Sequence, residues 1–133
     1  MIASAEWKQG MLFEGRTQSG HAITFDATAG HTAGPSPMEA VLAALCACTS
    51  VDVASILEKK REPVTGLIVS ADAEQAGEPP RVFTRIHLTY HIKGKVTPAA
   101  AEHAVSLSKN KYCSVSKMLE KAVEISYSIE HVD

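Results

Sequence analysis

The stretch that decides the fold is GPSPMEAVLAALCACTSV, residues 34–51. Ser36 can cap a helix, Pro37 suits the first helical position, and Glu39 follows Ser36 at the capping-box spacing. After Glu39 the stretch is apolar or small at every position, and a helix that is apolar on all faces is a buried one. We therefore expect a central helix, running to about Arg61, that is wrapped by a sheet or by a sheet and a partner subunit.

The segments on either side of this helix carry strand and helix patterns. The expected strands cover residues 3–13, 21–26, 67–74, 82–93 and 123–130, and two further helices cover 98–110 and 113–119. A turn-rich stretch, residues 15–20, separates the first two strands. The resulting order, ββαββααβ, indicates an α+β fold with an antiparallel sheet, in a single domain covering residues 1–133.

The overall composition is that of an ordinary globular domain. The chain has 133 residues, 45% of them apolar and 21% charged, with a net charge of −2. No basic stripe favours nucleic acid, and aromatic residues make up only 5%, too few for a base-stacking surface. We expect no nucleic-acid partner.

Three cysteines and an unremarkable N-terminus indicate a reducing compartment. A disulfide-dense secreted scaffold is excluded, because three cysteines cannot all pair within one chain. The N-terminus shows no basic and apolar signal pattern. The longest uncharged apolar run, Ala40–Val51, is well short of the roughly 20 residues that a membrane span needs. We expect a cytoplasmic protein with no membrane association.

The chemistry centres on cysteine. Cys48 lies on the buried helix, and Cys113 lies at the start of a short helix, where the positive helix end can depress a thiol pKa. Tertiary folding could join these two thiols as a redox pair. Cys46 is two positions from Cys48 and points to a nearly opposite face, which favours simple packing. Arg16, in the turn-rich stretch, is a cation that can project toward a site.

Two segments carry a family resemblance. The run Gly34–Thr49 resembles the central-helix motif of the OsmC/Ohr family (osmotically inducible protein C and organic hydroperoxide resistance protein). Tyr112–Leu119 resembles its second motif, in which the cysteine is followed by Pro-x-Ser. The element order agrees over essentially the whole chain. The resemblance implies an intertwined homodimer with a cysteine pair at its interface that reduces organic hydroperoxides, and in some members hydrogen peroxide.

The resemblance also assigns roles by position. It implies that Cys48 is the peroxidatic cysteine, that Cys113 is the resolving cysteine, and that Arg16 supports the thiolate. It implies a dithiol reductant, a lipoyl protein in well-studied members; thiols carry the chemistry, so no cofactor is expected. The family's glutamate directly follows the proline, whereas here Met38 takes that place and Glu39 comes next. Glu39 then either contributes through the partner subunit or a helix irregularity, or only caps the helix.

Further features leave alternatives open. Ser114 stands where the family usually has proline, and Asp52, one turn after Cys48, would raise a thiol pKa unless a cation pairs it. Besides a peroxidase, the sequence is compatible with a non-enzymatic dimer that binds a small apolar ligand, or with a thiol redox sensor. The histidines show no ligand spacing, so we expect no metal site.

Overall fold

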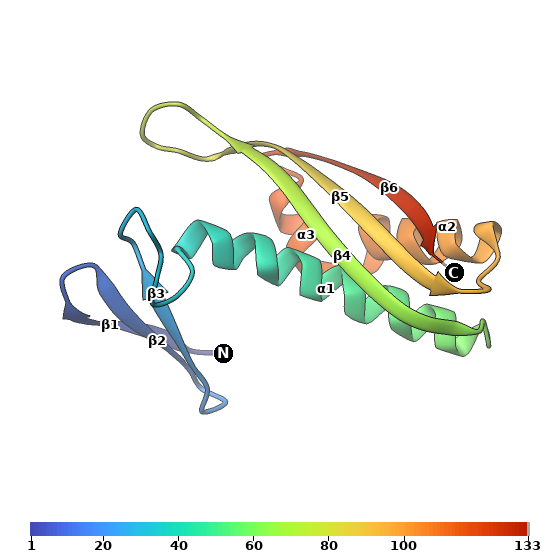
Figure 1. Ribbon diagram of the computed structural model, residues 1–133, viewed down its shortest axis with the longest axis horizontal. Coiled ribbons are helices and arrows are strands. Elements are labelled where there is room, and N and C mark those ends of the chain that lie inside the picture. Colours follow the sequence, from blue (N-terminus) through green and yellow to red (C-terminus); the bar gives the residue numbers. More distant parts are fainter. Residues whose placement is uncertain (133) are drawn as a thin grey trace. The chain divides into compact units, whose positions relative to one another are not determined.

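Three antiparallel strands form the N-terminal part of the protein. The computed structural model describes residues 1–132 and divides into two units, residues 1–42 and a unit that begins at Ala43. The first unit holds a sheet of order β1-β2-β3, with β1 at Ala3–Gln9, β2 at Leu12–Thr17 and β3 at Ala22–Asp26. Figure 1 shows these strands in blue.

The expected single strand over residues 3–13 is two strands. Gly10 adopts a φ of 54°, a left-handed conformation that glycine tolerates best, and its carbonyl accepts a 2.8 Å hydrogen bond from Trp7 Nε1. This tight turn reverses the chain between β1 and β2. The turn-rich stretch is correspondingly shorter than expected, because β2 continues through Thr17.

The central helix α1 runs over Pro37–Lys59, close to its predicted bounds. A stripe of residues spaced four apart is buried: Leu45, Thr49, Val53 and Leu57. The prediction of burial on every face is wrong for the single chain, since Val51 is 69% exposed. One buried stripe thus packs the helix in the single chain, and the rest of its apolar surface is only partly covered.

By length and composition, α1 is the one helix of residues 1–132 that could cross a membrane. The sequence expectation considered only the uncharged run and so missed this. The core helix of a soluble protein passes the same test.

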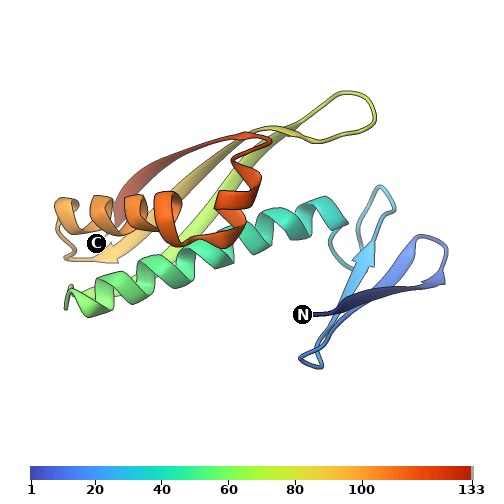
Figure 2. The same ribbon diagram turned by 180° about the vertical axis from the view of Figure 1, so that it is seen from behind.

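A second three-stranded sheet, of order β4-β5-β6, belongs to the second unit. Its strands are β4 at Val64–Gln75, β5 at Phe83–Gly94 and β6 at Glu124–Val132. From Ile86 to Ile92 every second residue of β5 is buried, as the alternation predicted: Ile86, Leu88, Tyr90 and Ile92. Thr84, expected on the same face, is exposed. Figures 1 and 2 show α1 and α2 (Pro98–Leu107) on the same face of this sheet.

The sheet is mixed rather than purely antiparallel. β4 and β5 are antiparallel, but β5 and β6 are parallel. Parallel neighbours require a crossover connection, and three helical segments supply it. These are α2, the π-helical segment η1 at Ser108–Tyr112, and α3 at Ser114–Leu119. The expected helix over 98–110 thus changes to π-helical geometry at Ser108, and Cys113 lies between η1 and α3.

Candidate functional site

Two thiols from different helices meet in the second unit. Cys48 is on α1 and half-buried, whereas Cys113 is fully buried. The Cys48 thiol lies near enough to Cys113 to raise the pKa of the Cys113 thiol. Both are free thiols. The structure therefore brings together the two cysteines that the sequence analysis considered as a redox pair.

Backbone contacts on both sides hold Cys113 in place. Its N–H donates to the Ser108 carbonyl at 2.7 Å, the closing bond of the π-helical turn. Its Sγ accepts from the Ser116 N–H at 3.4 Å, so Cys113 caps α3 with its own side chain. Residues before and after Cys113 in the sequence thus hold it in place.

The expected depression of the Cys113 pKa is wrong. Burial raises the pKa of the Cys113 thiol to about 11, and the Ser116 N–H lowers it only in part. The neighbouring Cys48 thiol and the Asp52 carboxylate contribute to the same increase of the pKa. The helix end does act in the predicted direction, but α3 has only 6 residues and the loss of hydration outweighs it.

A chain of buried hydroxyls lies beside the cysteines. Tyr90 OH and Thr49 Oγ1 are 2.7 Å apart, and Thr49 Oγ1 and Ser108 Oγ are also 2.7 Å apart. Ser108 Oγ donates to Asp52 Oδ2 at 2.8 Å. Burial, first of several causes, raises the pKa of Tyr90 to about 12, so its hydroxyl stays protonated at neutral pH. Polar side chains of β5, α1 and η1 thus satisfy one another.

Sequence reasoning identified Asp52 but missed the rest of this chain. The carboxylate is not paired with a cation; it accepts the Ser108 hydroxyl instead. One signal was available, because the β5 alternation turns Tyr90 inward, and a buried tyrosine hydroxyl needs a partner. The helical spacing groups Ser108 with the apolar residues of its helix, but nothing in the sequence indicated the partners of its hydroxyl.

Arg16 is on strand β2 rather than in a turn. Its Nη2 pairs with Glu14 Oε1 at 2.5 Å, and its side chain is exposed. Strand alternation brings the two charges together, since residues two apart share a face. Arg16 belongs to the first unit and the cysteine pair to the second, so its support of the Cys48 thiolate stays a prediction.

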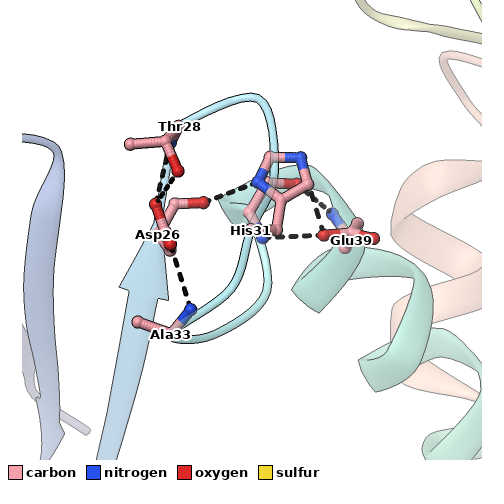
Figure 3. A network of polar contacts seen from close by, with 6 residues as sticks. Asp26, Thr28, His31, Ala33 and Glu39 are labelled. Carbon is pink, nitrogen blue, oxygen red and sulfur yellow. Dashed lines mark hydrogen bonds and ion pairs between the residues drawn. The ribbon is translucent and has the colours of Figure 1, made fainter.

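Glu39 takes part in the capping box that its spacing predicted. Its Oε1 accepts from the Ser36 N–H at 2.9 Å, and its own N–H donates to Ser36 Oγ at 3.1 Å. His31 Nε2 lies 4.0 Å from Glu39 Oε1. Figure 3 shows Glu39 at the start of α1, facing His31. Glu39 therefore caps the helix; its further expected role in catalysis stays a prediction.

Asp26 organises the loop that leads to this cap. Its carboxylate accepts from Thr28 N–H and Oγ1 and from Ala33 N–H, as Figure 3 shows. These hydrogen bonds, that of the Thr28 hydroxyl first, lower the pKa of Asp26. The Asp26 carbonyl lies 2.7 Å from His31 Nδ1. The loop is thus fixed by side-chain contacts, although it has neither helix nor strand.

A groove of about 370 Å³ lies beside the cysteine pair in the second unit. It is lined by Val51, Asp52, Ser55, Ile56, Lys59, Leu107 and Tyr112. Asp52 and Tyr112 connect it to the pair, because Asp52 influences Cys113 and Tyr112 directly precedes it. Among residues 1–132, no three His, Cys, Asp or Glu side chains are grouped closely enough to hold a metal ion.

The fold and the site define an α+β protein with two adjacent thiols, one on a central helix and one at the start of a short helix. The chain belongs to the OsmC-like protein family, whose model matches residues 30–128. This confirms the resemblance stated from the two cysteine segments. Protein YhfA of Escherichia coli (strain K12) is 46% identical over 133 residues, with 99% of this chain and 98% of YhfA covered.

Solved structures confirm the fold. The OsmC-like protein of Mycoplasma pneumoniae superposes with a TM-score of 0.86 at 19% identity, covering 99% of this chain and 96% of that one. The organic hydroperoxide resistance protein OsmC of Legionella pneumophila gives 0.74 at 18% identity, covering 97% and 95%. The α+β fold and its element order are therefore those of OsmC-like proteins.

Proposed function

We propose that the protein is a thiol-dependent peroxidase that reduces organic hydroperoxides. The observation that carries this proposal is the proximity of the Cys48 and Cys113 thiols, which are near enough for Cys48 to raise the pKa of Cys113. A solved structure of the same fold is named as an organic hydroperoxide resistance protein, which supports a redox role in stress protection. Membership of the OsmC-like family supports it as well.

The two thiols have unequal surroundings, which suggests their order of reaction. Cys48 is half-buried and Cys113 is fully buried, so peroxide reaches Cys48 first. The Cys48 thiolate attacks the O–O bond, leaving a sulfenic acid on Cys48 and releasing the alcohol. Cys113 then attacks the sulfenic sulfur, water leaves, and a Cys48–Cys113 disulfide forms. An external dithiol, such as a lipoyl protein, reduces this disulfide by exchange.

The proposal includes a homodimer in the cytoplasm. The exposed Val51 and the small residues around it leave an apolar face on α1 that a second copy can cover. Arg16 is proposed to support the Cys48 thiolate, because arginine stays charged at any working pH. Glu39 would assist only in addition to its cap.

The first test is peroxide consumption by the purified protein with dithiothreitol as reductant. tert-Butyl hydroperoxide and hydrogen peroxide are compared on wild type, Cys48→Ser and Cys46→Ser. Cys46 is a matched control on the same helix. We expect Cys48→Ser to fall to the buffer rate and Cys46→Ser to stay within twofold of wild type. Multiple turnovers by Cys48→Ser would overturn the proposal.

Cys113→Ser separates the two chemical steps. Without a resolving thiol, we expect one turnover and a sulfenic acid on Cys48 that dimedone traps and mass spectrometry detects. A variant that instead cycles at the wild-type rate with dithiothreitol would show that Cys113 is not needed to resolve the intermediate.

An apolar hollow favours a second candidate, the binding of a small apolar ligand. It measures about 390 Å³, lies within the first unit and is lined by Ala5, Phe13, Phe25, Ala27 and Pro37. Thiol counting separates the two functions. One equivalent of cumene hydroperoxide removes two free thiols per subunit from a peroxidase, whereas a ligand-binding protein loses none stoichiometrically.

A further inference from the structure

Ser108 connects the helix of one cysteine to the backbone of the other. It is fully buried at the junction of α2 and η1. Its hydroxyl contacts Thr49 Oγ1 and Asp52 Oδ2, both on α1, at 2.7 and 2.8 Å. Its carbonyl accepts the N–H of Cys113 at 2.7 Å. One residue thus holds both sides of the thiol pair.

The two α1 partners of Ser108 lie just after Cys48 in the sequence. Thr49 is the next residue, and Asp52 is one helical turn further on. The directions of the bonds are fixed by the carboxylate, which only accepts. Ser108 donates its single proton to Asp52 and accepts from Thr49. Thr49 in turn accepts from Tyr90. Each hydroxyl proton is used once, so the chain has one consistent arrangement.

We propose that Ser108 is a positioning residue for the disulfide, holding Cys113 in register with Cys48. This inference rests on the proposed function only for the pairing of Cys48 with Cys113. Two thiols held close together behave as reactants at a high effective concentration, because the entropy of bringing them together is already lost. Without the hydroxyl of Ser108, the η1 segment gains alternative positions in the reduced protein, and the disulfide becomes less favourable.

A second buried serine beside Cys113 provides a matched control. Ser116 is 1% exposed and Ser108 is 0% exposed. Within residues 1–132 the Ser116 hydroxyl finds no hydrogen-bond partner, whereas the Ser108 hydroxyl has two side-chain partners. The N–H of Ser116 that contacts Cys113 belongs to the backbone and is retained in alanine. Ser108→Ala and Ser116→Ala therefore remove the same atom from equally buried sites.

The test is the equilibrium of the Cys48–Cys113 disulfide with reduced and oxidised glutathione, in a Cys46→Ser background. Mass spectrometry gives the disulfide fraction, and no peroxide is needed. We expect Ser108→Ala to lower the equilibrium constant for disulfide formation about tenfold, which makes the potential about 30 mV less negative. We expect Ser116→Ala to stay within twofold of the parent. Equal values for Ser108→Ala and the parent, or equal shifts in both serine variants, would overturn the inference.

Asp52 supplies a second comparison, which holds even if Ser108→Ala folds poorly. Asp52→Asn keeps an oxygen that accepts from Ser108, and Asp52→Ala does not. We expect Asp52→Ala to shift the potential in the same direction as Ser108→Ala, and Asp52→Asn to shift it less. A parent that forms no disulfide overturns both this inference and the proposed mechanism. If Ser108→Ala shifts the potential as expected but the parent consumes no peroxide, only the proposed function is overturned.

Discussion

At the scale of single residues, the raised pKa values make stability depend on alkaline pH. Burial in the folded protein raises the pKa of Cys113 from 9.0 to about 11 and the pKa of Tyr90 from 10.0 to about 12. At a pH between the lower and the higher pKa of either group, the folded protein keeps a proton that the unfolded protein has lost. The contribution of these two groups to the free energy of unfolding is thus complete below about pH 9 and decreases as the pH rises toward 11–12.

We expect the free energy of unfolding of the reduced protein to fall by about 2 kcal/mol between pH 8 and pH 10.5. Urea unfolding in the presence of a phosphine reductant measures it. Cys113→Ser removes the largest titrating group, so its fall over the same interval should be about half or less. An identical pH dependence in both proteins would contradict the burial of an un-ionised Cys113 thiol.

The sequence alone could predict the residues whose chemistry is local. The capping role of Glu39 follows from its distance to Ser36, and the adjacency of Cys48 and Cys113 was considered from their placement on separate helices. The prediction of a depressed Cys113 pKa was wrong, because the burial of a side chain is a tertiary property. The helical spacing grouped Ser108 with the apolar residues of its helix, but its hydroxyl contacts with α1 are tertiary as well and could not be predicted.

At the scale of elements, α1 presents two kinds of surface. Val53 is fully buried, and Val51, two residues away, is 69% exposed. We expect Val53→Ala to destabilise the chain by about 2 kcal/mol, since it removes buried methyl groups and leaves a cavity. Val51→Ala should change the stability of the dilute protein by about 0.5 kcal/mol or less. Denaturant unfolding measures both, and equal effects would contradict the packing described for α1.

The element order was predictable apart from the division of residues 3–13 into β1 and β2, but two geometric details were not. Helix and strand positions followed from periodicity and from the cap of α1. The change from α2 to the π-helical η1 leaves no periodic signature over 5 residues. The parallel pairing of β5 with β6 depends on the path of α2, η1 and α3, which no single element encodes.

At the scale of the whole molecule, the exposed face of α1 leads to a test of assembly. If a second copy covers Val51, a charge there disrupts the interface, because a carboxylate cannot be buried unpaired. We expect wild type to sediment as a dimer and Val51→Glu as a monomer, with Glu58→Gln as a surface control. A wild-type monomer at micromolar concentration would contradict the proposed homodimer.

The separation of Cys48 and Cys113 along the chain has a topological consequence. A disulfide between them would enclose β4, β5 and α2 in a covalent ring of roughly 65 residues. Closing a ring of that size removes unfolded-state entropy worth about 4 kcal/mol at 25 °C. The oxidised chain would then be more stable against unfolding than the reduced chain, and it would resist proteolysis until a reductant opens the disulfide. During turnover the molecule would therefore alternate between a reduced form without the ring and an oxidised form in which the disulfide closes it.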